Sequence, residues 1–300
     1  CARATTATCP MGRNPLLFEL FAAESNPLTD LPIAAITQAL DRTDAGAAHT
    51  GWWLRADPVM LRPDGDRLLM LGNHALSLNI AEATALSGEL HEVFATYGMA
   101  FFAPHPTRWY LQLETDPGLT LTALEAVVAH DILQHLPQSS DAQTAARWRR
   151  LLNEVQMQLH NSPVNQARIA RGDQPVNSVW FWGGGAVPAV APHYFQQVWS
   201  DDPVSLGLAC LSGAAYGSVP ESPADWLPHI TRPGRRLLAP APPTTPDDDT
   251  HAEMFSSQWC TPLLAAVKSG ALATLDIYTD NGKLFHITPQ TFRRWYDRFI

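Results

Sequence analysis

Residues 151–185 constrain the fold of this chain more than any other segment. An amphipathic helical pattern comes first, then a polar turn rich in proline, asparagine and arginine, and then an apolar strand that ends in three glycines. A strand that runs into glycines is typical of α/β proteins, because residues without a Cβ let the backbone approach a ligand or another element closely. The segment therefore predicts a mixed helix–strand fold, with Gly183, Gly184 and Gly185 as one candidate binding element.

Helix and strand patterns alternate along the rest of the chain, which favours an α/β architecture, with α+β as the alternative. Asn79 followed by Glu82 forms a capping-box pattern at the start of one helix. The turn residues 280–282 between two apolar runs indicate a β-hairpin. Helices are expected near 15–24, 32–40, 80–97, 142–159, 204–211 and 261–269, and strands near 51–55, 67–71, 108–113, 176–182, 273–278 and 283–287.

Composition shifts along the chain predict four regions. The first residue is Cys1 rather than Met, so we expect the natural N-terminus to be missing and residues 1–14 to be irregular. Prolines and glycines between residues 186 and 250 predict mostly loop. The four regions are an N-terminal helical segment at 1–50, an α/β domain at 51–234, a proline-rich and then acidic linker at 235–250, and a helix, hairpin and helix at 251–300.

Charge, hydropathy and cysteine content exclude several classes of partner. The net charge of -9, from 20 basic and 29 acidic residues, lacks the basic surface that nucleic-acid binding requires. No uninterrupted apolar stretch approaches the roughly 20 residues of a membrane span. The four cysteines are scattered without a CxxC pair, which predicts a reduced, cytoplasmic protein without zinc or disulfides.

Three arginines are candidates for binding an anion. Arg55 is followed by Asp57 at a strand end, Arg108 begins another strand, and Arg168 lies in the polar turn. A guanidinium group can hold a carboxylate or phosphate through two hydrogen bonds. For Arg55 and Arg108 taken alone, a simple ion pair is the favoured role, because most ion pairs near a protein surface have no function.

Two asparagines and the glycines accompany these arginines. Asn165 lies in the polar turn, and Asn177 lies in the strand, where asparagine is disfavoured, so Asn177 is expected to hold a backbone or ligand hydrogen bond. The glycines match neither the dinucleotide-binding nor the P-loop pattern, which leaves an anion-binding turn or a tight structural turn. Residues 180–182 are expected to be core aromatics, with one indole at the rim of a cleft.

Common catalytic and metal-binding signatures are missing from the sequence. Neither GxSxG nor HExxH occurs, and no cysteine has an identifiable base partner. The acidic run at 247–253 favours a solvated linker over a site for a hard cation. We therefore predict no metal, no cofactor and no catalytic residue.

From Gly51 to about Tyr216 the order of motifs resembles the archaeal-type cofactor-independent phosphoglycerate mutases of the alkaline-phosphatase superfamily. In that family an arginine-bearing strand is followed by a capped helix and then by a second strand with arginine. Residues 53–57, the helix after Asn79, and residues 104–113 resemble these three elements.

The next family motifs are a helix that begins Leu-Asn, a His-Pro-Val-Asn-x-x-Arg turn and a strand that begins with Asn. Residues 152–153, 163–168 and 177–183 resemble them in order and spacing, while Ser162 stands in place of the histidine. The chain is still more similar to the proteobacterial RpfE-type regulatory proteins, whose hallmarks resemble residues 53–59, 104–110, 151–157 and 175–185. This resemblance implies a partial phosphatase/mutase-like architecture followed by the C-terminal helix–hairpin–helix segment.

Mutases of this superfamily need two divalent metals held by Asp and His residues, together with a Ser or Thr nucleophile. Their signatures are absent between residues 1 and 300. The departure implies a catalytically incomplete, regulatory protein that binds a phosphorylated or carboxylated metabolite among Arg55, Arg108, Arg168 and the glycines. One alternative is an active phosphoryl-transfer enzyme that uses the acidic run with Asp247, Asp249 and His251. Another is a protein-interaction module that binds a protein partner through the Trp/Pro-rich surface after Gly185.

Overall fold

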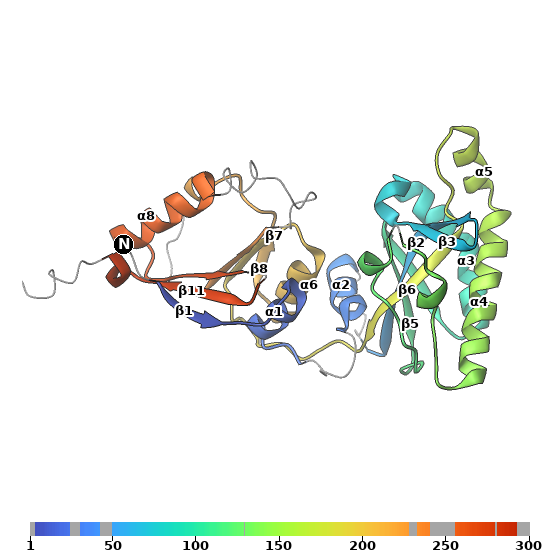
Figure 1. Cartoon of the computed structure of the whole chain (residues 1–300), viewed down its shortest axis with the longest axis horizontal. Helices are drawn as coiled ribbons and strands as arrows, with labels where there is room; N and C mark the ends of the chain where they lie inside the picture. The colour runs from blue at the N-terminus through green and yellow to red at the C-terminus, as the bar shows by residue number, and fades with distance from the viewer. Residues whose placement is uncertain are drawn as a thin grey trace, which may run out of the picture. The chain divides into compact units, whose positions relative to one another are not determined.

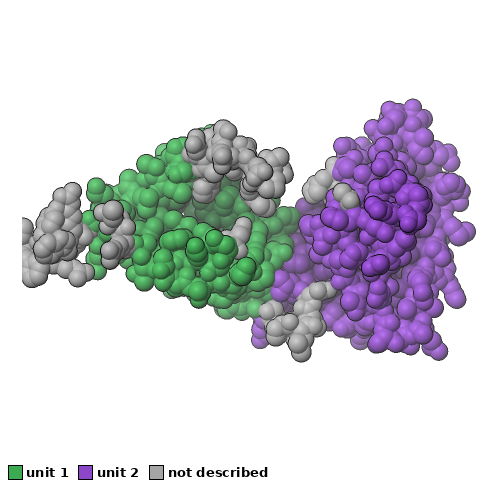
Figure 2. Space-filling view, in the orientation of Figure 1, with its two compact units in different colours: residues 1–23, 190–300 green, residues 24–189 purple. Residues whose placement is uncertain are grey.

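The computed structural model contains two compact units built from different parts of the chain. One unit combines Cys1–Ala23 with Val190–Ile300, and the other is the continuous segment Glu24–Ala189 (Figure 2). We call them unit 1 and unit 2. A segment from each end of the chain thus shares one unit, which no local composition pattern signals. The structure describes residues 4–24, 31–42, 50–128, 130–227, 233–240, 256–279 and 281–292.

Unit 2 is built on a five-stranded sheet in which every pairing is antiparallel. The order of four strands is β3-β2-β5-β4, and β6 also pairs with β2. β2 is 13 residues long and pairs with β5, β6 and β3 along different stretches, so it extends well past the predicted strand at 51–55. The bounds are β2 Trp52–Asp64, β3 Arg67–Leu71, β4 Ala100–His105, β5 Arg108–Leu113 and β6 Ser178–Gly185.

Two long helices, α3 (Ile80–Thr96) and α4 (Ala142–His160), cover one face of this sheet (Figure 1). The predicted capping box starts α3, because the Asn79 side chain accepts from the Glu82 N–H and the Glu82 carboxylate accepts from the Asn79 N–H. Each large apolar side chain buried in this core stabilises the fold by about 1.5–3 kcal/mol. The core includes Leu86, Leu90 and Phe94 from α3, Trp148, Leu152 and Val155 from α4, and Leu54, Trp109 and Phe181 from the sheet.

The opposite face of the sheet is covered by α2 (Ile33–Asp41) (Figure 1). Both ends of this helix lie within one residue of those predicted from the sequence. β5 therefore has both faces covered, and Tyr110 is buried as completely as Trp109. The alternating pattern of this strand is typical of a half-buried strand, but side-chain alternation cannot show whether a second element covers the more polar face.

The polar turn predicted after α4 is the short helix α5 (Pro163–Ala170). The Ser162 hydroxyl caps it by accepting from the Asn165 N–H, and Pro163 occupies the first turn. Serine followed by proline is a favourable helix start, because proline has no N–H to leave unpaired there. The segment was predicted to be a turn because proline and asparagine, which are common in turns, lie at the start of this helix.

Unit 1 contains an antiparallel sheet of order β1-β11-β10. The predicted hairpin is confirmed, with β10 (Leu275–Tyr278) paired to β11 (Lys283–Ile287), although Asp280 in its turn lies outside the described residues. β1 (Thr5–Thr8) pairs with β11, so the irregular start predicted for residues 1–14 was wrong. A strand of four residues needs a distant partner and leaves too short a pattern to recognise.

Two helices of unit 1 follow their predictions closely. α1 (Arg13–Leu20) begins and ends earlier than the 15–24 predicted. α8 (Thr261–Ser269) has proline in its first turn and ends at Gly270, whose φ of 83° is the left-handed conformation that glycine adopts without strain. The last of the predicted C-terminal helices falls largely on residues 293–300, which lie outside the described part of the chain.

The region at 186–250, predicted to be mostly loop, forms a second sheet in unit 1. β7 (Gln197–Ser200) lies between β8 (Ala215–Gly217) and β9 (Arg236–Ala239), and both pairings are parallel. α6 (Pro203–Ser212) connects β7 to β8, as expected for a parallel crossover. The predicted linker therefore begins inside a strand, and its residues 241–250 lie outside the described chain.

The mixture of sheets and helices confirms the predicted α/β fold class. Across the described residues, no helix combines the length and the apolar character needed to cross a bilayer. The remaining short helical segments are η1 Asn73–Leu76, η2 Leu124–Ala126, η3 Leu133–His135, η4 Pro223–Asp225, the π-helical turn Ser256–Cys260 and η7 Pro289–Phe292.

Candidate functional site

A cluster of charged and aromatic side chains lies between α2 and the sheet of unit 2. Arg55 and Asp57 alternate with Leu54 and Ala56 along β2, so they face α2 while their neighbours face the core formed with α3 and α4. Strand register places Arg55 beside Tyr110 on one side and beside Trp182 on the other. We call this set the α2 cluster; its members are Thr37, Asp41, Arg55, Asp57, Arg108, Tyr110 and Trp182.

Arg55 binds Asp57 through two parallel hydrogen bonds. Its Nε lies 2.9 Å from Oδ1 and its Nη2 lies 2.8 Å from Oδ2. The guanidinium also stacks between the rings of Tyr110, at 5.3 Å, and Trp182, at 5.1 Å. Only 4% of Arg55 is exposed, so the geometry is that of the ion pair and not of an open clamp for substrate.

Asp57 is the most deeply buried carboxylate of the cluster. Besides the two bonds from Arg55, it accepts from the Trp109 N–H at 3.2 Å and from the Trp182 indole Nε1 at 2.8 Å. Burial raises the pKa of Asp57 above its ordinary value, although the Arg55 charge and the indole hydrogen bond act in the opposite direction. Sequence reasoning missed the role of Trp182, which alternation along β6 could have revealed.

Arg108 holds a different carboxylate, that of Asp41 at the end of α2. Its Nε and Nη2 each lie 2.6 Å from an oxygen of Asp41, and the Tyr110 hydroxyl donates to the same carboxylate at 2.5 Å. Burial tends to lower the pKa of Arg108, but the hydrogen bonds and charge of Asp41 raise it overall. Burial raises the pKa of Tyr110, and the Asp41 charge adds to this effect. No spacing in the sequence pairs Asp41 with Arg108.

The third predicted arginine, Arg168, belongs to a separate cluster. It is 1% exposed and binds Glu82 at 2.5 Å, together with the carbonyls of Leu76 and Gln174. Arg171 binds the other oxygen of Glu82 at 2.6 Å. Neither Arg55 nor Arg108 binds any of these partners. Arg168 instead connects α5 to the start of α3 through Glu82. We call Glu82, Arg168 and Arg171 the Glu82 cluster.

Both predicted asparagines bind backbone. Asn165 donates to the carbonyls of Leu159 and Val176 and accepts from the Val176 N–H. Asn177 accepts from the Leu61 N–H at 2.7 Å and donates to the Leu61 carbonyl at 2.8 Å. The Asn177 amide thus forms the same pair of hydrogen bonds that a neighbouring strand would form. The expected hydrogen bond is confirmed, and its partner is backbone.

The three glycines do not form the predicted turn but continue β6 beneath α2. A Cβ at Gly185 would lie 2.3 Å from the Cβ of Pro32, and one at Gly183 would lie 3.0 Å from the Cβ of Ile33. Gly183 also has a φ of 63°, which favours glycine. A Cβ at Gly184 would lie 2.7 Å from Leu54. The glycines do allow a close backbone approach, as predicted, but the group that approaches them is the start of α2 and not a ligand.

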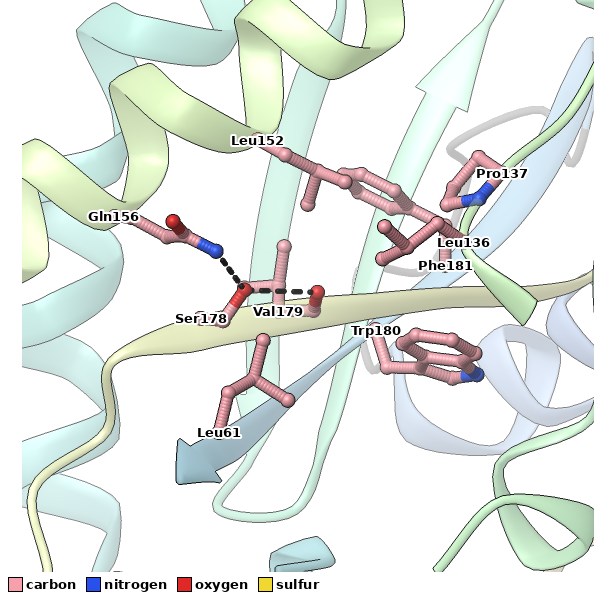
Figure 3. Close-up of a pocket in the computed structure, with 9 residues that line it drawn as sticks. All are labelled: Leu61, Leu136, Pro137, Leu152, Gln156, Ser178, Val179, Trp180 and Phe181. Carbon is pink, nitrogen blue, oxygen red and sulfur yellow. Dashed lines mark hydrogen bonds between the residues drawn. The ribbon is translucent and has the colours of Figure 1, made fainter. Parts of the chain in front are cut away.

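Two hollows in unit 2 lie beside β6 and away from the arginines. An open groove of about 780 Å³ runs between α4 and the β2–β3 hairpin. Next to it is a small cavity of about 10 Å³, where the Gln156 amide reaches the Ser178 hydroxyl at 3.4 Å (Figure 3). The groove is lined by Leu61, Pro63, Leu68, Asn153, Gln156, Met157, His160, Asn161 and Asn177.

No three His, Cys, Asp or Glu side chains gather closely enough to hold a metal ion within the described ranges. Asp247, Asp249 and His251, the residues of the alternative cation site, lie outside those ranges. The three cysteines that are described, Cys9, Cys210 and Cys260, form no disulfide with one another.

Comparison with known proteins relates the chain to cofactor-independent mutases, although no protein-family model matches it. It is 27% identical over 161 residues to a probable 2,3-bisphosphoglycerate-independent phosphoglycerate mutase of Geobacter sulfurreducens. It is 32% identical over 66 residues to a 2,3-bisphosphoglycerate-independent phosphoglycerate mutase of Methanothrix thermoacetophila. These matches cover 53% and 20% of this chain, but only 38% and 16% of the respective relatives.

Among solved structures, the cofactor-independent phosphoglycerate mutase of Thermoplasma acidophilum matches with a TM-score of 0.49 and 16% identity. That match covers 96% of this chain and 80% of the other. The chain is thus similar in sequence to cofactor-independent phosphoglycerate mutases over about half of its length.

Proposed function

We propose that this chain is a regulatory, ligand-binding relative of cofactor-independent phosphoglycerate mutases, of the RpfE type. Its ligand is a small phosphorylated or carboxylated metabolite, and Arg108 is the residue of the α2 cluster that contacts it. The similarity to mutases supports the class of metabolite, because the named relatives act on phosphoglycerates. We assign the contact to Arg108 because its side chain is partly exposed.

Arg108 differs from the other two predicted arginines in what remains available to a ligand. Its side chain is 17% exposed, whereas Arg55 and Arg168 are almost fully buried. Nε and Nη2 bind Asp41, and no described residue accepts from Nη1. A partly exposed guanidinium with a spare N–H edge suits charge-assisted binding of an anion. Arg55 and Asp57 support it by fixing the Tyr110 ring next to it.

Thermal unfolding of the full chain with 3-phosphoglycerate tests the proposal. A ligand that binds only the folded state adds about 2.7 kcal/mol of stability at 100 times its dissociation constant, which raises the unfolding midpoint. We expect this rise without added metal in the wild type, and its loss in Arg108→Lys, which keeps the charge but lacks the planar fork. Arg171→Ala, an exposed arginine of the Glu82 cluster, is the matched control and should keep the rise. No rise in the wild type would refute the proposal.

An active phosphoryl-transfer enzyme is the second candidate, because both sequence relatives are named as mutases. It predicts interconversion of the phosphoglycerate isomers that depends on Mn²⁺ and is abolished by a chelator. Turnover under those conditions would favour the enzyme over the regulatory protein. A pure protein-interaction module would show neither turnover nor a ligand-dependent rise.

A further inference from the structure

The carboxylate of Asp41 occupies a preformed binding site. Three donors point at its two oxygens, namely Nε and Nη2 of Arg108 and the hydroxyl of Tyr110, all at 2.5–2.6 Å. We call Arg108 and Tyr110 the carboxylate cradle. Only 7% of the Asp41 side chain is exposed, so its carboxylate fills the cradle almost completely.

The cradle fits the planar carboxylate of Asp41. The forked edge of a guanidinium matches the two oxygens of a carboxylate with parallel hydrogen bonds. Tyr110 donates to one of those same oxygens from the side. A carboxylate already fills the cradle in this structure, so between the two anion classes of the proposed function we infer that a ligand carboxylate takes its place.

The cradle and its occupant differ in how firmly the fold holds them. Arg108 and Tyr110 lie on β5, which pairs with β2 along one edge and with β4 along the other. Asp41 is the last residue of α2, and Arg42 after it is already extended. A carboxylate is also disfavoured at a helix C-terminus, where the helix dipole is negative. Releasing Asp41 thus disturbs one helix end, where Arg42 still stacks on Trp53 and Phe102, and leaves the sheet intact.

We propose that Asp41 is an internal competitor for the ligand: a metabolite carboxylate binds Arg108 and Tyr110 by displacing Asp41, and so removes the hydrogen bonds that join the last residue of α2 to the sheet. This inference rests on the proposed function and specifies its ligand class and its regulation. A ligand that must displace Asp41 binds more weakly than it would bind an empty cradle. Its apparent dissociation constant is the intrinsic constant divided by the fraction of molecules in which the cradle is empty.

Calorimetric titration of 3-phosphoglycerate into Asp41→Asn tests the competition. The amide keeps the size of the side chain but loses its charge, so we expect the dissociation constant to fall by about tenfold. Glu82→Gln is the matched control, because it removes one equally paired negative charge from the Glu82 cluster and leaves the cradle unchanged. Its dissociation constant should equal that of the wild type.

Two simpler probes separate the carboxylate from the phosphate. Glycerate carries only the carboxylate, and glycerol 3-phosphate carries only the phosphate. We expect glycerate to bind, and to bind more tightly to Asp41→Asn, while glycerol 3-phosphate shows no difference between the two proteins. Tighter binding of glycerol 3-phosphate to Asp41→Asn would assign the cradle to phosphate and overturn the inference about ligand class.

Hydrogen exchange in the wild type measures the displacement without any substitution. Saturating 3-phosphoglycerate should increase exchange at the last amides of α2 and leave those of β5 protected. Binding that leaves both α2 exchange and the Asp41→Asn affinity unchanged would overturn this inference and leave the proposed function standing. Failure of both the wild type and Asp41→Asn to bind would instead remove the proposed function itself. Binding by Asp41→Asn alone would show that Asp41 blocks the cradle but would still refute the proposed function, because the wild type would then bind no ligand.

Discussion

The α2 cluster and the Glu82 cluster each bury an arginine against a carboxylate, but the partners come from very different distances along the chain. Arg55 is held by Asp57, two residues further on the same strand. Arg168 is held by Glu82, 86 residues earlier on another helix. A pair within one strand is visible in the sequence as soon as the strand is recognised. A pair between two helices becomes visible only when those helices pack.

The two clusters also differ in what their open sides present. The Glu82 cluster ends in Arg171, whose side chain is 52% exposed and is shared between Glu82 and Asp173. The α2 cluster ends in Arg108 and Asp41, which are mostly covered and hold each other in a bidentate pair. Solvent screens the first pairing and leaves the second nearly unscreened. Substitutions in the α2 cluster should therefore have the larger effects.

The largest expected effect is that of Arg55→Ala. This substitution leaves the carboxylate of Asp57 fully buried without its cation, which typically costs about 3–5 kcal/mol. Urea denaturation followed by tryptophan fluorescence measures the loss. Replacing both partners, as in Arg55→Met with Asp57→Leu, should recover much of it, because no charge then remains buried. A loss in Arg55→Ala no larger than that in Arg171→Ala would contradict the comparison.

A second substitution tests how closely α2 lies on the sheet. Alanine at Gly185 would place its Cβ 2.3 Å from Pro32, so the helix would have to shift, at a cost of about 1–3 kcal/mol. Gly88→Ala is the matched control, because nothing lies within 4 Å of that position in α3. The control should gain about 0.5–1 kcal/mol from helix propensity. Equal unfolding midpoints for the two variants would show that α2 does not pack as described.

Glu82→Gln probes the other cluster and should depend on pH. Burial alone would raise the pKa of Glu82, but hydrogen bonds from Arg171 and Asn79 and the charge of Arg168 lower it below 4.5. A carboxylate with a lowered folded pKa stabilises the protein above its unfolded pKa and loses that contribution as the pH falls through the folded value. We expect a loss of about 1–3 kcal/mol at pH 7.

The same variant supplies its own control at low pH. Below the folded pKa of Glu82 both proteins carry a neutral side chain at this position, so their denaturation curves should converge. A difference that stays constant as the pH falls from 7 to the onset of acid unfolding would mean that the ion pairs of the Glu82 cluster contribute nothing measurable.

Arg171→Ala should have the smallest effect on stability. Its guanidinium is half exposed, and Glu82 keeps Arg168 as a buried partner when Arg171 is removed. We expect an unfolding midpoint close to that of the wild type in moderate salt. A loss of stability comparable with that of Glu82→Gln would mean that Arg171, and not Arg168, supplies most of the stabilisation in the Glu82 cluster.

Much of the fold follows from short-range patterns. The capping box of α3, the proline start and glycine end of α8 and the β10–β11 hairpin each depend on residues within a few positions of one another. Local hydrogen bonding and backbone preference decide such features, so they survive without knowledge of the tertiary structure. The expected bond of Asn177 belongs with them, because an asparagine in a buried strand must satisfy its amide.

The candidate site was predictable only in part. Alternation placed Arg108 and Tyr110 on one face of β5 and suggested the pairing of Arg55 with Asp57. It could not supply Asp41, which reaches Arg108 across 67 positions of the chain. The predicted anion site also grouped Arg168 with the other two arginines, whereas the packing of α5 places that residue against Glu82.

The sequence by itself determined the long helices α3 and α4, the start and end of α8, the β10–β11 hairpin and which side chains share a face of a strand. Tertiary structure alone decided that β2 pairs with three strands, that β1 joins β11, and that the glycines of β6 receive a helix instead of a ligand. The physical reason is the range of the interactions. Backbone preference and capping act within a turn, whereas the partner of a strand edge, a buried charge or a missing Cβ is set by whichever distant element packs there.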